Sequence, residues 1–173
     1  QARNGLAWWR SSGAIQVQLA GDASEQAYSA LLPSAELGQE VMRVPFNEEE
    51  LARMAAGTLG STERELRAAL HALHWLQDRA PELIRNKTIQ YQTDSQSAWM
   101  CLLGQKGANN CLYLVRDILV DSAQAGCEIS LVWYPRTGTV QREADRIGKE
   151  TDPAQWALNH DIYRRIMTGP CLQ

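Results

Sequence analysis

Hydrophobic and polar residues alternate along several short stretches of the chain, a period of two that predicts β-strands. The clearest stretch, residues 14–22 (AIQVQLAGD), places isoleucine, valine and leucine on one face and two glutamines on the other. Similar patterns predict strands at residues 26–33, 40–46, 88–94 and 128–134. Because short turns separate the first three strands, we expect them to form an antiparallel meander, with prolines marking edge or terminal positions in two of them.

A period near 3.6 residues predicts helices in most of the remaining chain. In chain order, these helices are expected at about residues 48–56, 60–79, 98–103, 110–126 and 140–149, with a last one after Pro153. Strands and helices in this order make a mixed α/β layout, which we interpret as a single domain over residues 1–173. In this interpretation residues 1–12 form an N-terminal apron, and residues 153–173 form a C-terminal helical extension.

The composition, 45% hydrophobic and 21% charged, is typical of an ordinary globular domain with a full core. No apolar run approaches the roughly 18–20 residues that a membrane-spanning helix needs, and no signal-peptide pattern opens the chain. We therefore expect an intracellular protein of the cytoplasm or nucleus, not secreted and without a membrane partner. The chain begins at Gln1 without a methionine, so we expect it to be part of a longer polypeptide.

The net charge of −3 argues against a protein that holds nucleic acid by bulk electrostatics alone. The acidic residues are concentrated, with seven of them between Asp22 and Glu50 against the single Arg43. Any contact with nucleic acid must therefore come from a local basic surface or from another domain.

Cysteine and histidine do not form a recognisable zinc motif. The four cysteines include no CxxC pair, and we expect them to be buried or free thiols in a reducing compartment. His71 and His74 lie one turn apart on a predicted helix, with no acidic or cysteine partner nearby in the sequence. A zinc site is therefore not favoured.

Two aspartates stand at the ends of alternating strands. Asp22 and Asp94 each fall on the polar face of their strand, at the point where the strand gives way to a turn or a helix. An aspartate at such a junction is often an Asx turn or a helix N-cap. A metal ligand is the alternative for each residue, and neither position decides between the two by itself.

Two further carboxylates lie on predicted helices. Glu65 is at the margin of an apolar stripe, where it would face the sheet, and an isolated carboxylate there would be costly. The alternative is a capping box, in which Glu65 reaches back to the amide of Thr62. Asp145 lies on the helix after the fifth strand, where the alternative is a first-turn acid favoured by the helix dipole.

The four carboxylates together indicate more than each does alone. If the two strands that end in aspartate are neighbours, their ends meet at one edge of the sheet, and the two helical acids can complete a cluster there. Carboxylates this close together repel one another unless cations lie between them. Oxygen ligands of this kind suit Mg²⁺ or Mn²⁺. The chemistry that matches is phosphodiester hydrolysis with two metal ions about 3.5–4 Å apart.

The order of these acids resembles the ribonuclease H family. The motifs are "GDASEQAYSALL" at the first strand, "STERELRAALHAL" on a helix, "TDS" after a strand, and "VWYPRTGTVQREADRIGK" at the end. With "LAWW" near the start and "DPAQWALNHDIYRRI" near the end, the chain more narrowly resembles the ribonuclease H domains of reverse transcriptases of long-terminal-repeat and tyrosine-recombinase retroelements. The resemblance covers roughly residues 6–168.

The resemblance implies a fold, a site and a reaction. It places the four catalytic, metal-binding carboxylates on Asp22, Glu65, Asp94 and Asp145, with two Mg²⁺ or Mn²⁺ ions as cofactors. It implies a five-stranded mixed sheet, with the first three strands antiparallel, flanked by helices. The implied activity is endonucleolytic cleavage of the RNA strand of an RNA/DNA hybrid.

The chain departs from the family in the loop before the last aspartate. Many members carry a histidine there, whereas this loop reads YPRTGTV and contains Arg136, either a phosphate contact or a solvated loop residue. Loss of the histidine is expected to slow turnover without abolishing metal chemistry. The basic and aromatic residues that some members use to grip the hybrid are also missing, since residues 105–110 include one lysine. We therefore expect a polymerase domain of the same polypeptide to supply affinity for the hybrid.

Four other polar residues are candidate contacts to the hybrid. Ser95 and Gln96 follow the "TDS" turn, where capping of the next helix is the alternative role. Asn109 and Asn110 stand where amides can approach the 2′-hydroxyls that distinguish RNA from DNA, or where they can cap a helix.

Three functions are consistent with the sequence. The first is an active ribonuclease H within a reverse transcriptase or a protein derived from one. The second is a non-catalytic domain of the same fold that acts as a scaffold or binds a partner. The third is a nuclease or integrase of the same fold that acts on DNA.

Overall fold

A computed structural model describes residues 15, 17–34, 38–104, 106–135 and 139–149 of the chain. The predicted apron, the predicted C-terminal extension and Arg136 lie outside these described residues. Within them, no helix is long and apolar enough to cross a membrane.

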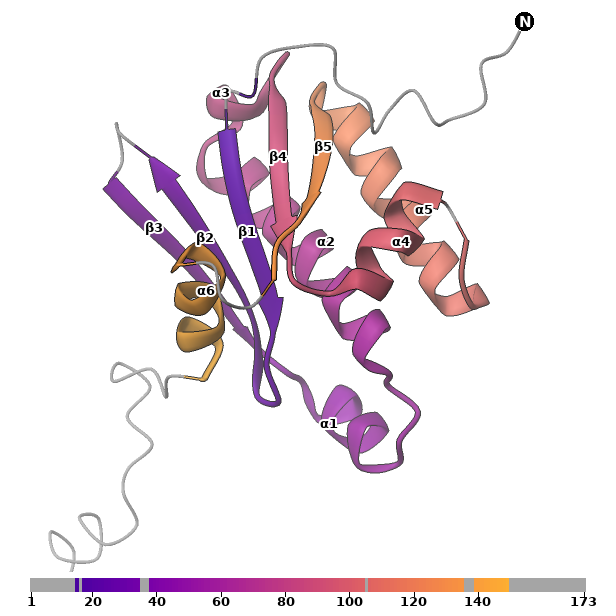
Figure 1. The fold of residues 1–173 in the computed structure, drawn as a ribbon. Coiled ribbons are helices and arrows are strands. Elements are labelled where there is room, and N and C mark those ends of the chain that lie inside the picture. The colour runs from indigo at the N-terminus through magenta and orange to yellow at the C-terminus, as the bar shows by residue number, and fades with distance from the viewer. Residues whose placement is uncertain (1–14, 16, 35–37, 105, 136–138, 150–173) are drawn as a thin grey trace, which may run out of the picture.

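The described residues form one five-stranded sheet in the order β3-β2-β1-β4-β5 (Figure 1). The strands are β1 (Val17–Ala23), β2 (Ala27–Ser34), β3 (Gly38–Pro45), β4 (Thr88–Thr93) and β5 (Glu128–Trp133). Strand β2 pairs antiparallel with both β1 and β3, whereas β4 runs parallel to both β1 and β5. The predicted mixed sheet with an antiparallel first half is therefore confirmed.

Six helices accompany the sheet within the described residues. They are α1 (Glu48–Ala55), α2 (Ser61–Arg79), α3 (Pro81–Ile84), α4 (Gln96–Gly104), α5 (Asn109–Ala125) and α6 (Thr139–Lys149). Five of them match predicted helices, and only the single turn α3 was missed. Its proline stands at the first helical position, where a missing amide hydrogen is harmless, and was interpreted only as the end of α2.

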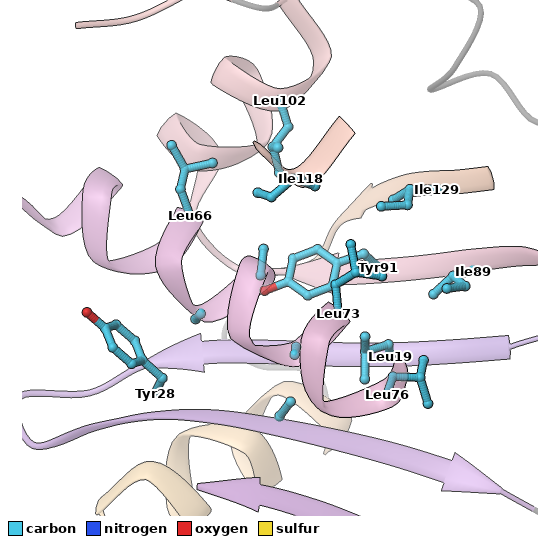
Figure 2. Close-up of a cluster of buried hydrophobic side chains, with 14 of the residues drawn as sticks. Leu19, Tyr28, Leu66, Leu73, Leu76, Ile89, Tyr91, Leu102, Ile118 and Ile129 are labelled. Carbon is cyan, nitrogen blue, oxygen red and sulfur yellow. The ribbon is translucent and has the colours of Figure 1, made fainter. Parts of the chain in front are cut away.

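The helices pack on both faces of the sheet. Helices α2 and α5 bury their apolar stripes against one face, where Leu19 lies in the main hydrophobic cluster (Figure 2). Helix α6 covers the other face, where Ala144 and Ile147 pack against Ala20 and Leu31. In Figure 1, α6 accordingly stands on the opposite side of the sheet from α2.

Strand β4 is buried along its whole length, although its sequence alternates. Tyr91 and Ile89 face the main cluster, and the glutamines of the other face are buried as well. Gln92 Nε2 donates a hydrogen bond to Gln90 Oε1 at 3.0 Å, which supplies these two amides with a partner inside the protein. The predicted polar face is therefore not a solvent-exposed face, because β4 is a central strand with neighbours on both sides.

The direction of the elements defines one functional edge. Strands β1 and β4 run parallel, so their carboxyl ends lie at the same edge of the sheet. Helix α2 begins at that edge and runs back across the sheet (Figure 1). Residues at the end of β1, at the end of β4 and near the start of α2 are thereby brought together.

Candidate metal centre

Three of the four predicted carboxylates meet at this edge of the sheet. Asp22, Glu65 and Asp94 each offer an oxygen atom, and these atoms all lie within 4.8 Å of one another. Asp22 and Glu65 are buried, with 1% and 6% of their surface exposed, and Asp94 is half-buried. Two buried carboxylates this close to a third form a strongly negative site that is shielded from bulk water on one side.

The turn after β4 holds Asp94 in place through its backbone. Trp133 Nε1 donates a hydrogen bond to the Asp94 carbonyl at 2.9 Å, and the Ser95 amide donates to Thr93 Oγ1 at 3.1 Å. The Ser95 hydroxyl accepts a hydrogen bond from the Ala98 amide at 3.2 Å, the bond that an N-cap side chain makes. Ser95 is therefore a cap of α4, which leaves the Asp94 carboxylate to face the other acids.

Glu65 does not form the capping box that was the alternative interpretation. Helix α2 has Gly60 as its N-cap, without a side-chain cap, and Thr62 donates instead to Ser97 Oγ at 2.8 Å. Glu65 lies inside the helix and is buried toward the sheet, as expected from its place on the apolar stripe. Among the described helices, α1 does have a capping box, in which the side chains of Asn47 and Glu50 accept hydrogen bonds from each other's backbone amides.

Asp145 is not part of the group of three. Its carboxylate Oδ2 lies 2.7 Å from Lys149 Nζ, and about a third of its side chain is exposed (35%). Because α6 begins at Thr139, Asp145 is also too far along the helix to be the first-turn acid of the alternative interpretation. Its helix is nevertheless anchored next to β1, since Ser29, which pairs with Asp22 in the sheet, donates to the Ala144 carbonyl at 2.8 Å.

The candidate contacts to a hybrid have mixed surroundings. Gln96 and Asn109 are exposed. Asn110 donates its side-chain amide to the buried carboxylate of Glu63. The alternative role of the two asparagines as helix caps is wrong, because the N-cap of α5 is Ala108 and no side-chain cap bond is present there.

Glu63 organises a second set of charges beside the site. Arg53 and Arg67 lie 2.9 Å and 3.0 Å from Glu63 Oε1. Burial alone would raise the pKa of Glu63, but the hydrogen bonds from Arg67, Asn110 and Arg53 lower it overall. This carboxylate therefore has its own cations, which sets it apart from the three acids at the sheet edge.

Sequence reasoning missed one residue, Tyr91, that is influenced by the charges of the three acids. The Tyr91 side chain is 4% exposed, and burial raises its pKa well above the usual value, with further contributions from the charges of Glu65, Asp22 and Asp94. Its hydroxyl lies over Gly21, where a side chain would not fit. Glycine inside a strand pattern is the signal that could have pointed to this close approach.

The three acids are suited to a hard divalent cation. Their ligand atoms are all carboxylate oxygens, the ligands that Mg²⁺ and Mn²⁺ prefer, and they are close enough together to contact one ion. The residues present therefore fit the metal that the sequence pattern predicted.

Comparison with known proteins gives a fold but no family assignment by sequence. No family model matches the chain, and no curated protein matches it.

Solved structures of ribonucleases H1 share the fold. Ribonuclease H1 of the halophilic archaeon Halobacterium salinarum NRC-1 matches with a TM-score of 0.50 at 17% identity, over 76% of this chain and 92% of that one. LC11-RNase H1, isolated from compost by a metagenomic approach, matches with a TM-score of 0.57 at 11% identity, over 78% and 93%. The same enzyme in complex with an RNA/DNA hybrid matches with a TM-score of 0.56 at 13% identity, over 76% and 92%. The chain therefore has the ribonuclease H-like fold.

Proposed function

We propose that this protein is a metal-dependent endoribonuclease that cleaves the RNA strand of RNA/DNA hybrids. The observation that carries the proposal is the meeting of Asp22, Glu65 and Asp94 within 4.8 Å on a ribonuclease H-like sheet. The pattern of acids in the sequence pointed to this reaction, and LC11-RNase H1, which shares the fold, has been crystallised with an RNA/DNA hybrid.

The three acids, with Asp145 as a fourth ligand, would hold two Mg²⁺ or Mn²⁺ ions. Bound metal supplies an activated water and stabilises the leaving oxygen of the phosphodiester. The chain itself contributes the orientation of the ligands. Trp133 and Thr93 hold the turn that carries Asp94, and the buried position of Asp22 limits its freedom to move.

Asp145 joins the site in this proposal by exchanging Lys149 for a metal ion. Both side chains of this ion pair are partly exposed to solvent, and such a pair contributes at most about 1 kcal/mol to stability. The exchange therefore has a small energetic cost. The anchoring of α6 by Ser29 keeps Asp145 beside β1 throughout.

The hybrid would be recognised by few residues of this chain. Gln96 and Asn109 are exposed polar residues on α4 and α5, and we propose them, with Ser95, as contacts to the 2′-hydroxyls that mark the RNA strand. Asn110 would contribute indirectly, by fixing the position of the neighbouring Asn109, because its own side-chain amide is bonded to Glu63. Arg136 is proposed as a phosphate contact on the basis of the sequence pattern.

A reverse-transcriptase polymerase domain in the same polypeptide is part of the proposal. The net charge of −3 and the single lysine among residues 105–110 support it, since the chain lacks the positive charge that holds a hybrid by itself. A polymerase domain would supply that affinity and deliver the hybrid to the three acids.

The direct test is cleavage of a hybrid with a labelled RNA strand in Mg²⁺ and in Mn²⁺. We expect the wild type to cleave and Asp94→Asn to lose at least about 100-fold in rate, because a ligand charge is removed from the site. Glu128→Gln is the matched control, since this exposed carboxylate lies at the start of β5, at the opposite edge of the sheet. Absence of cleavage by the wild type with either metal, also when joined to a polymerase domain, would overturn the proposal.

A non-catalytic role is the second candidate, and the Asp145–Lys149 ion pair favours it. In that case Lys149 would occupy the fourth carboxylate permanently, and the domain would act as a scaffold. Tight Mn²⁺ binding by the wild type together with hybrid cleavage would exclude this role. Competition between hybrid and duplex DNA in the same assay separates both from a nuclease that acts on DNA.

A further inference from the structure

Tyr91 has a buried hydroxyl group next to Gly21, the residue that precedes Asp22. Its side chain is 4% exposed, and its hydroxyl oxygen makes no hydrogen bond to any residue that the structure describes. Figure 2 shows the ring within the hydrophobic cluster, with the hydroxyl at the end nearest α2, the helix that carries Glu65. The group is therefore a buried hydrogen-bond donor that faces the helix carrying Glu65.

The neighbouring strand is shaped to admit this hydroxyl. Leu19 of β1 pairs with Tyr91 of β4, and Gly21 is two residues further toward the acidic edge. A Cβ atom at Gly21 would lie 2.1 Å from the Tyr91 hydroxyl oxygen and 2.8 Å from Cζ. The tyrosine thus reaches forward over a glycine that immediately precedes Asp22.

The electrostatic surroundings agree with this placement. After burial, the causes that raise the pKa of Tyr91 are the charges of Glu65, Asp22 and Asp94, in that order. These are the same three residues whose oxygen atoms gather within 4.8 Å. The hydroxyl therefore lies within reach of their field and stays protonated, as a donor must.

A group of this kind is a poor choice for stability alone. A buried hydroxyl without a hydrogen-bond partner destabilises the folded state, and phenylalanine would fill the same space without that cost. Glycine in the interior of a central strand also weakens the strand. The pair Gly21 and Tyr91 therefore combines two features that a core selected only for packing would avoid.

We propose that Tyr91 is a positioning residue of the metal centre, whose hydroxyl donates a hydrogen bond to a ligand carboxylate when a divalent cation is bound. The inference rests on the proposed function and adds to it a residue that the sequence pattern does not include. Groups that orient metal ligands commonly change metal affinity by about 10–100-fold when they are removed. Tyr91 acts through the carboxylates and does not touch the substrate.

Tyr91→Phe tests the inference with two measurements on the full chain. In EDTA we expect the urea midpoint of Tyr91→Phe to equal or exceed that of the wild type, because a buried hydroxyl without a partner is removed. In titrations with Mn²⁺ alone, followed by calorimetry, we expect the affinity to fall about 10-fold or more. If the tyrosine were merely structural, Tyr91→Phe would lose stability in EDTA and would keep the wild-type affinity for Mn²⁺.

Tyr28→Phe is the matched control. Tyr28 is also fully buried, but its hydroxyl donates to Glu50 Oε1 at 2.7 Å, a carboxylate that is not one of the three acids. This variant is expected to lose stability in EDTA and to keep the wild-type affinity for Mn²⁺.

Each outcome has a distinct meaning. If the wild type binds Mn²⁺ and Tyr91→Phe binds it equally well, or if Tyr91→Phe is less stable in EDTA, the role of Tyr91 is overturned while the proposed function stands. If the wild type itself does not bind Mn²⁺, the proposed function fails first. A fall in affinity without a loss of stability supports the inference.

Discussion

The ammonium group of Lys149 lies 2.7 Å from the carboxylate Oδ2 of Asp145, one helical turn away on α6. This ion pair occupies the one predicted ligand that is not part of the three-acid group. In the proposed site, Asp145 is available to a cation only when it leaves Lys149. The strength of the pair therefore sets how readily the fourth carboxylate joins the site.

Lys149→Gln is expected to raise the affinity for Mn²⁺ by at most about five-fold, because an exposed ion pair contributes at most about 1 kcal/mol. Calorimetric titration without nucleic acid measures this change. Removal of a positive charge near a cation site raises affinity by itself, so the double variant Lys149→Gln/Asp145→Asn is required. If the double variant binds Mn²⁺ more tightly than Asp145→Asn alone by the same factor, the gain comes from the charge of Lys149 and not from release of Asp145.

Gly21→Ala is expected to destabilise the protein by about 1–3 kcal/mol, the usual cost of overpacking a core. The added methyl group would lie 2.1 Å from the Tyr91 hydroxyl oxygen, inside the contact distance of the two atoms. Urea unfolding measures the loss. In a Tyr91→Leu background the shorter side chain makes room, so Gly21→Ala should cost clearly less there. An equal cost in both backgrounds would show that Tyr91 is not the residue that requires glycine.

Glu63→Gln is expected to destabilise the protein by about 3 kcal/mol, because it removes the buried counter-charge that Arg53 and Arg67 share and leaves Arg67 only its longer pair with Glu50 at 3.5 Å. The estimate is at the lower end of the range for buried pairs, since Arg53 and Arg67 are each 29% exposed. Urea unfolding at neutral pH measures the effect. Glu143→Gln, which breaks the exposed pair with Arg146, is the control and should change stability by less than about 1 kcal/mol. A similar loss in both variants would contradict the buried network.

Because His71 is partly buried, we expect the protein to lose stability on mild acidification. Its ring stacks on Tyr28 with centroids 4.8 Å apart, and burial lowers its pKa below the usual value of about 6.5. When the pKa of a histidine is lower in the folded state than in the unfolded state, protonation favours the unfolded state. The free energy of unfolding is therefore unaffected by His71 above about pH 6.5, and it decreases as the pH falls below that value.

Urea unfolding at pH 7.5 and at pH 5.0 measures this loss. His71→Phe keeps the ring stack and is expected to lose less stability between the two pH values than the wild type does. His74→Asn is the control, since His74 is more exposed and bonds to Asp121. If His71→Phe and the wild type lose the same amount, other groups cause the acid sensitivity.

The sequence by itself determined most of the secondary structure and the three acids of the site. Alternation and helical spacing are local signals, and every strand and all but one helix of the described residues followed from them. Asp22 and Asp94 could be paired in advance because both end a strand, and parallel neighbouring strands end at one edge. Glu65 was identified by its place on an apolar stripe, where its burial toward the sheet was expected.

The tertiary structure alone decided which competing partner each polar group takes. Asp145 pairs with Lys149, Asn110 bonds to Glu63, and Thr62 bonds to Ser97. The sequence had left a different role open for each of the three residues. The Tyr91 hydroxyl can lie against β1 only because the residue beside it on that strand is Gly21. Such choices depend on distances of a few ångströms between segments far apart in the chain, and local periodicity contains no information about them.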